Sequence, residues 1–127
     1  MKKIFYTQVK LLGEIKSYLT QVLSNLDTIH EDEIIIVINE IIQNIYRHAY
    51  KLKENQEIIL EHELKNNRIN FTIRDFAEHI DLSFMTQTFT PGEEGKIGVN
   101  IIKKVSERYE IKHMQKGHLT VCEIKLN

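Results

Sequence analysis

The sequence is poor in the features that mark secreted, membrane-spanning and nucleic-acid-binding chains. Its single cysteine, Cys122, cannot form an internal disulfide, which points to a reducing cytoplasm. Charges interrupt every apolar run well short of the ~20 residues that cross a bilayer. No apolar stretch follows the basic start at Lys2 and Lys3, as a signal peptide requires. Lys and Arg total 17 against 18 Asp and Glu, a balance that argues against direct contact with nucleic acid or a membrane surface.

Proline and glycine are also scarce, with one proline and five glycines in 127 residues. Pro91 and three of the glycines fall within residues 91–98, so backbone freedom is concentrated in one stretch. No repeat, low-complexity run or linker divides the chain. A chain of this length with 42% hydrophobic residues can bury one core, and we expect a single domain over residues 1–127.

Helical spacing dominates the first part of the sequence. Apolar residues recur at three- and four-residue steps over Val9–Leu26, which predicts a helix there, after a short strand at Lys3–Thr7. Asp27 and Thr28 are expected to end this helix, and Thr28 or Asp32 to cap the next one.

Residues 32–50 combine two signals. The β-branched run Ile34–Ile38 alone suggests a buried strand. The apolar stripe nevertheless continues at helical spacing as far as Ala49, over a segment much longer than a typical strand. Length therefore favours a helix that is buried on more than one side.

The period then changes to two, which predicts strands on either side of a turn at residues 65–67. A long loop covers residues 76–94, and loops of that length are usually functional. A helix begins at Gly95, and two more strands follow around a second turn. The four strands are expected at Glu57–Leu64, Arg68–Arg74, Tyr109–Gln115 and Leu119–Leu126. The fold class is therefore α+β, a two-layer sandwich in which three helices cover one face of a mixed, mostly antiparallel sheet.

Three polar residues share one side of the second helix. Glu40, Asn44 and His48 lie about 40° apart around the axis, away from the isoleucine stripe. A solvated polar face explains them most simply on spacing alone. The alternative is a seam facing metal and phosphate, because carboxylate and amide oxygens are ligands that suit Mg²⁺.

Two further positions can carry chemistry. Asp75 ends a strand, where its carboxylate can accept a hydrogen bond from a bound base or simply cap a turn. Gly95 and Gly98 lie where a loop enters a helix, and backbone N–H groups at such a start favour an anion. Lys96 adds a cation there, although the glycines can equally serve as a flexible entry to the helix. The spacing is not that of a P-loop.

The histidines and the cysteine give weaker signals. His113 and His118 flank a turn without further ligands beside them, so we do not expect a transition-metal site. Cys122 lies in an alternating strand and is interpreted as a small core residue.

Three stretches resemble, in this order, the ATP-binding motifs of the Bergerat fold shared by gyrase-type, histidine-kinase and related ATPases. Residues Asn39–Tyr50 (NEIIQNIYRHAY) resemble the first ATP motif of the anti-sigma-factor serine/threonine kinases. Ile73–Phe76 and Gly95–Ile102 resemble the second and third motifs. The order of elements also matches, so the resemblance covers essentially the whole chain.

The resemblance implies a role for each matching residue. Asn44 would coordinate Mg²⁺, Glu40 would act as general base, and Asp75 would accept from the adenine amino group. Gly95 and Gly98 would let the loop close over the phosphates, with residues 79–94 as the ATP lid. The other expected nucleotide-binding residues are His48, Ala77, Lys96, Ile97 and Val99. Ala77 and Lys96 stand where many members of the family have glycine.

The implied function is an ATP-dependent serine/threonine kinase that holds a sigma factor and phosphorylates an antagonist, the anti-anti-sigma protein. A homodimer is also plausible by resemblance. One alternative is a nucleotide-gated binding module that transfers no phosphate. Another is the ATPase domain of a histidine kinase, although His30 lies only between two helices and no acceptor helix is evident.

Overall fold

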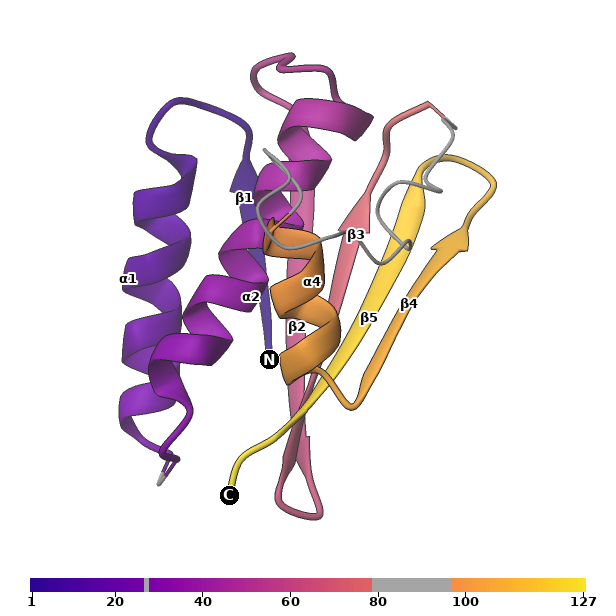
Figure 1. Ribbon diagram of the computed structural model, residues 1–127. Helices are drawn as coiled ribbons and strands as arrows, with labels where there is room; N and C mark the ends of the chain where they lie inside the picture. The colour runs from indigo at the N-terminus through magenta and orange to yellow at the C-terminus, as the bar shows by residue number, and fades with distance from the viewer. Residues whose placement is uncertain (27, 79–96) are drawn as a thin grey trace.

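The computed structural model describes residues 1–26, 28–78 and 97–127. Strands and helices follow the predicted order, with a strand at the start (Figure 1). They are β1 (Lys2–Tyr6), α1 (Leu11–Ser24), α2 (Glu31–Asn44), the π-helix η1 (Ile45–Ala49), β2 (Glu57–Lys65), β3 (Arg68–Asp75), α4 (Ile97–Val105), β4 (Arg108–His113) and β5 (His118–Lys125).

The five strands form one sheet in the order β1-β2-β3-β5-β4. All four neighbouring pairs are antiparallel, so the expectation of a mixed sheet is wrong. The reason is that the hairpin of β4 and β5 joins the sheet through β5, which runs opposite to β3. The register places Asp75 between Ile58 and His118, and the end of β3 therefore lies between two neighbouring strands.

The helices α1, α2 and α4 lie on one face of this sheet, and the predicted two-layer sandwich is confirmed (Figure 1). The core forms between the layers from alternate strand residues, such as Leu60, Phe71 and Cys122, which are fully buried. Transferring such side chains out of water stabilises the fold by roughly 1.5–3 kcal/mol each.

The isoleucine-rich segment is helical, as its length predicted. In α2 the buried residues spread around more than one side of the helix, because α2 contacts both α1 and α4. These residues are Ile34, Ile35, Val37, Ile38, Ile41, Ile42 and Asn44.

The predicted ends of the elements need small corrections. The first helix is four residues shorter than expected, and neither Thr28 nor Asp32 is the N-cap of α2. That position is occupied by His30, whose N–H donates to Thr28 Oγ1 over 3.1 Å. Thr28 is drawn away from the helix end because its hydroxyl donates to the carbonyl of Leu126 at 2.6 Å. Asp27 lies outside the described residues.

None of the helices in the described part of the chain has both the length and the apolar composition needed to cross a membrane.

Candidate functional site

Asp75 is the last residue of β3 and its carboxylate is buried. It continues the inward alternation of Ile69, Phe71 and Ile73, and only 1% of its surface is exposed. The Oδ1 atom accepts from the N–H of Ala77 at 3.1 Å and lies 3.1 Å from Nδ1 of His118. Within residues 1–26, 28–78 and 97–127, no protein donor contacts Oδ2. The carboxylate is thus held through one oxygen and keeps the other for a further donor.

The turn that follows Asp75 is held from two sides. Tyr50, just after η1, accepts the N–H of Phe76 at 2.7 Å and donates its hydroxyl to the carbonyl of Glu57 at 2.6 Å. Burial raises the pKa of Tyr50 to about 12, so the hydroxyl stays protonated and keeps both roles at ordinary pH. The Arg74 guanidinium donates to the carbonyl of Asp75 and stacks 4.4 Å above the ring centre of Phe76.

At Gly117, the turn between β4 and β5 packs directly against the backbone of Asp75 and Phe76. Its φ is +78°, a conformation that favours glycine. A Cβ atom on Gly117 would lie 2.1 Å from the carbonyl oxygen of Asp75, closer than any contact allows. The hairpin of β4 and β5 therefore supports the end of β3 directly.

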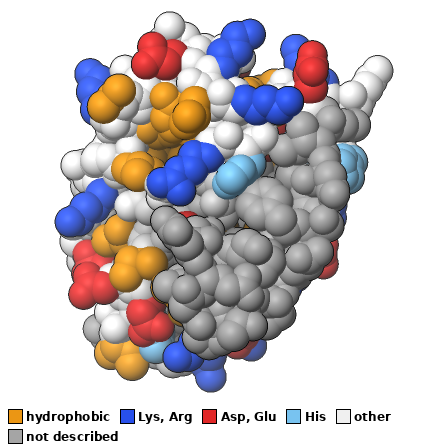
Figure 2. Space-filling view, turned by 45° about the horizontal axis from the view of Figure 1, so that its top comes forward, with side chains coloured by type: hydrophobic (Ala, Val, Ile, Leu, Met, Phe, Trp, Pro, Cys, Tyr) orange, Lys and Arg blue, Asp and Glu red, His pale blue; other side chains and the backbone are white. Residues whose placement is uncertain are grey.

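A cavity of about 550 Å³ opens beside this turn. Its lining includes Tyr50, Phe76 and Ala77, and its charged residues are the three lysines Lys51, Lys53 and Lys116 and one carboxylate, Glu78. Lys and Arg side chains are visible along the end of the molecule that comes forward in Figure 2. Several cations around a cavity favour an anionic ligand.

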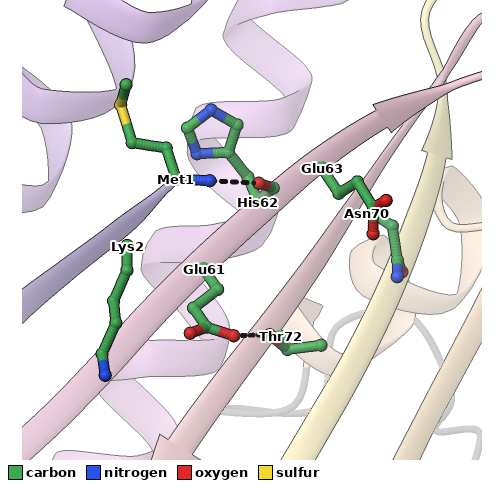
Figure 3. A pocket seen from close by; sticks show the side chains of 7 residues that line it. All are labelled: Met1, Lys2, Glu61, His62, Glu63, Asn70 and Thr72. Atoms are coloured by element: carbon green, nitrogen blue, oxygen red, sulfur yellow. Dashed lines mark hydrogen bonds between the residues drawn. The ribbon is translucent and has the colours of Figure 1, made fainter.

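Another hollow, of about 490 Å³, lies on the face of the sheet turned away from the helices (Figure 3). It is lined mainly by outward-facing side chains of β1, β2 and β3, such as Lys2, Glu61 and Thr72, and His62 reaches it from the edge of the inward-facing side. It contains none of the site residues predicted from the sequence.

The cavity beside the turn after β3 is lined by the predicted site residue Ala77, but not by Glu40, Asn44, His48 or Asp75. Because Ala77 follows the buried Asp75 by two residues and donates to its carboxylate, this cavity is the candidate site.

Asn44, the last residue of α2, is only 3% exposed. A solvated polar face therefore does not explain this residue, although the spacing alone favoured that interpretation. Its Nδ2 atom is buried and has no hydrogen-bond partner in the described part of the chain. A buried amide without partners costs free energy, so its presence calls for a ligand or another function.

The three polar residues of this helix do not share one environment. Glu40 is half-buried, and among the described residues it makes no hydrogen bond or ion pair, whereas His48 is exposed. His48 belongs to η1, where the N–H of Tyr50 donates to the carbonyl of Ile45, five residues back. This π-helical turn inserts an extra residue and ends the regular helical ridge at Asn44. Although His48 is exposed, desolvation of the covered part of its ring, together with the nearby Arg47, lowers its pKa.

The third predicted motif begins outside the described residues. Gly95, Lys96 and the expected lid at 79–94 lie there, so their predicted roles remain predictions. Ile97, Gly98 and Val99 form the first turn of α4, consistent with the predicted start of a helix close to Gly95.

The sequence interpretation missed four residues that hold Asp75. Tyr50 ends the first motif, but the sequence indicates no role for it, and it predicts only a strand at Arg74 and a turn at Gly117. The sequence predicts that the last strand begins at Leu119, whereas β5 begins one residue earlier, at His118. A useful signal was present, since Gly117 directly before a strand marks a position where another backbone approaches closely.

The remaining histidine and cysteine interpretations can also be compared with the structure. His113 faces His118 across the hairpin, with ring centres 5.1 Å apart. In the part of the chain that the structure describes, no group of three or more His, Cys, Asp or Glu residues is placed to hold a metal. Cys122 is fully buried as predicted, and burial raises the pKa of its thiol to about 11.

The chain belongs to the histidine kinase-like ATPase domain family, whose model matches residues 5–124. This agrees with the predicted Bergerat fold, and it leaves the narrower anti-sigma-factor kinase family as a proposal. No curated protein matches the sequence significantly.

Solved structures with a similar fold include several histidine kinases. The catalytic domain of histidine kinase ThkA superposes with a TM-score of 0.61 at 15% identity, covering 99% of this chain and 96% of that one. The histidine kinase domain of a blue-light activated kinase from Erythrobacter litoralis EL346 gives 0.60 at 16% identity. That match covers 91% of this chain, which spans only 59% of the Erythrobacter domain. AdeS from Acinetobacter baumannii gives 0.54 at 13% identity. At these identities the similarity concerns the fold alone.

Proposed function

We propose that this protein binds ATP with Mg²⁺ beside Asp75 and acts as an anti-sigma-factor-type serine/threonine kinase. The observation that carries the nucleotide assignment is the buried Asp75 carboxylate, with one oxygen held by protein donors. Its other oxygen is an acceptor that matches the exocyclic amino group of adenine. Guanine presents a carbonyl at the equivalent position, and two facing acceptors would leave a buried polar group unpaired.

The other site residues fit the rest of Mg·ATP. Asn44 would hold Mg²⁺ through its amide oxygen. Its buried Nδ2 atom, which has no partner among the described residues, is a donor and would contact a phosphate oxygen of the same ligand. The ion would neutralise phosphate charge. Lys51, Lys53 and Lys116, which line the cavity, favour a polyanion electrostatically.

The proposed reaction transfers the γ-phosphoryl group to a protein hydroxyl. The oxygen of a Ser or Thr side chain attacks the γ-phosphorus, the bond to the β–γ bridging oxygen breaks, and ADP leaves. Glu40 takes the hydroxyl proton. Since phosphoryl transfer depends mainly on positioning and charge neutralisation, a half-buried carboxylate without a competing partner among the described residues suits this task. The proposed protein partners are a sigma factor, which this protein would hold, and an antagonist that it phosphorylates; pairing into a homodimer is part of the same proposal.

A nucleotide-gated binding module is the second candidate. Ala77 stands at a position where many kinases of this type have glycine, and its buried methyl group lies in the cavity wall. Such a methyl group alters the fit of the nucleotide and favours binding without efficient turnover. In that case the protein would hold its partner in a nucleotide-dependent way and leave it unphosphorylated.

One experiment separates these functions from that of a histidine kinase. Purified protein is incubated with γ-labelled ATP and a lysate of the source cells, and labelled proteins are tested for acid stability. Acid-stable label on Ser or Thr of a partner is expected. Acid-labile label would indicate a histidine kinase, and nucleotide binding without label would indicate the binding module.

The general base is tested in the same assay with Glu40→Gln. Removing a general base typically lowers the rate ~10²–10⁴-fold, and ADP affinity should change little because the shape of the side chain is kept. Glu33→Gln, an exposed position in the first turn of the same helix, is the matched control. Equal transfer by parent and Glu40→Gln would contradict the assignment.

A further inference from the structure

Asp75 and His118 form a buried pair between neighbouring strands. Each is only 1% exposed, and they stand opposite one another in the register of β3 and β5. Nδ1 of His118 lies 3.1 Å from Oδ1 of Asp75. If the carboxylate is ionised, it can only accept hydrogen bonds, and Nδ1 of His118 is then the donor of this pair.

The pair determines which carboxylate oxygen is available to a ligand. Oδ1 already receives the N–H of Ala77, which comes from the chain just after β3. His118 reaches the same atom from β5, so two donors from different elements converge on it. Rotation of the carboxyl group would break at least one of these bonds. Oδ2 is thereby fixed as the acceptor that remains.

The backbone around His118 is held against the end of β3. Arg74 donates to the carbonyl oxygens of both Asp75 and His118, the latter at 3.3 Å. Gly117 packs on the backbone of Asp75 without room for a side chain. The start of β5 therefore cannot shift without moving Asp75, and the position of the His118 ring is well defined.

We propose that His118 is a positioning residue for base recognition, which holds Asp75 so that Oδ2 selects adenine, with its 6-amino donor, over guanine, which has a carbonyl at that position. This inference rests on the proposed nucleotide site. It assigns to the hairpin of β4 and β5 a part in ligand selectivity, although the hairpin contributes no residue to the three motifs of the sequence.

The test compares two variants whose side-chain amides lie at different distances from the backbone. His118→Asn places an amide nitrogen the same number of bonds from the backbone as Nδ1, and His118→Gln places it one bond further away. Calorimetric titration with ADP and GDP should show the parent's preference for ADP retained in His118→Asn. In His118→Gln the preference should fall about tenfold, the order expected when a hydrogen bond to a charged group is lost.

A matched control is His113→Asn, in the same hairpin and opposite His118. Because the donor to Asp75 remains in place, this variant should keep the parent's ADP and GDP affinities. If both His118 variants fold and show the parent's preference, or lose affinity for both nucleotides equally, His118 has only a structural role and the inference is wrong. If the parent itself does not prefer ADP, the proposed nucleotide site fails and the inference fails with it.

A second measurement needs no nucleotide. The ¹⁵N spectrum of histidine rings in the free protein distinguishes a protonated from an unprotonated Nδ1. We expect Nδ1 of His118 to be protonated in the parent. An unprotonated Nδ1 would overturn the proposed direction of the hydrogen bond, even if both variants failed to fold.

Discussion

His62 lies on the inward-facing side of β2, opposite Phe71 in the register of the sheet. Burial and the nearby N-terminal ammonium lower its pKa below the usual ~6.5. As the pH falls through 6.5, the unfolded chain therefore takes up a proton before the folded one does, and the free energy of unfolding decreases. The decrease continues down to the folded-state pKa and then stops.

We therefore expect the urea midpoint of unfolding to fall between pH 7 and pH 5. His62→Leu should make this fall shallower, because it removes the titrating group from an apolar environment. A residual slope should remain, since the pKa of His48 is lowered in the same direction. Parallel pH profiles for the parent and His62→Leu would show that His62 does not contribute.

The role of a single residue could be predicted from the sequence where the residue belongs to a motif. It could be predicted less well where its burial depends on packing against other elements. Asp75 was singled out from its place at a strand end, and the structure shows it buried there. The burial of Asn44 was not predictable from helical spacing alone, because spacing cannot tell which sides of a helix are covered by other helices. His118 was missed because its role depends on a cross-strand contact 43 residues away.

At the scale of elements, replacement by alanine should have opposite effects on stability at Gly13 in α1 and at Gly117 in the turn between β4 and β5. In α1, a Cβ atom on Gly13 would meet nothing within 4 Å, and Gly13→Ala should stabilise the protein by about 0.5–1 kcal/mol through higher helix propensity. Gly117→Ala forces a Cβ atom into the backbone of Asp75 at positive φ, and should destabilise by roughly 1–3 kcal/mol.

Urea unfolding of both alanine variants measures this difference, and ADP titration adds a functional readout. Gly117→Ala should also weaken ADP binding, because it displaces the turn that carries Asp75, while Gly13→Ala should leave binding unchanged. Equal stability of the two variants would contradict the contact between the hairpin and the end of β3.

Elements were predicted well where one periodicity was sustained. The strands β2 and β3 follow a clear alternation, and their bounds differ from expectation by one residue at most. The π-helical turn η1 was not predictable, since an inserted residue leaves the composition of the helix unchanged. It ends α2 at Asn44 and brings Tyr50 to the turn after β3, so a local irregularity helps to build the site.

On the scale of the whole molecule, the class of fold followed from the order of helical and strand signals. The sheet order and its fully antiparallel pairing did not, because they depend on how the second hairpin joins the first. That arrangement brings β5 beside β3 and supplies His118 to Asp75. The supporting residues of the site are therefore a consequence of topology.

The last prediction concerns the stability of the whole chain with and without ligand. Asn44 keeps a buried amide nitrogen without a partner among the described residues, and such a group costs about 1–3 kcal/mol. The isosteric, apolar variant Asn44→Leu should therefore fold at least as stably as the parent in the absence of ligand. With ADP at a hundredfold excess over Kd, binding adds roughly 2.7 kcal/mol to the parent, and the part of this gain that needs Mg²⁺ should vanish in the variant.

Thermal unfolding with ADP plus Mg²⁺, and with ADP plus a chelator, measures the Mg²⁺-dependent part of the stabilisation by ADP. Asn39→Leu is the matched control, because Asn39 lies in the same helix and its Oδ1 is also buried without a partner in the described part of the chain. The control should keep the full Mg²⁺-dependent gain, since its amide has no assigned ligand. If Asn44→Leu also keeps that gain, Asn44 does not hold the metal. If it instead unfolds at a much lower temperature than the parent without ligand, the buried amide is there for stability, and its unpartnered nitrogen has no connection with ligand binding.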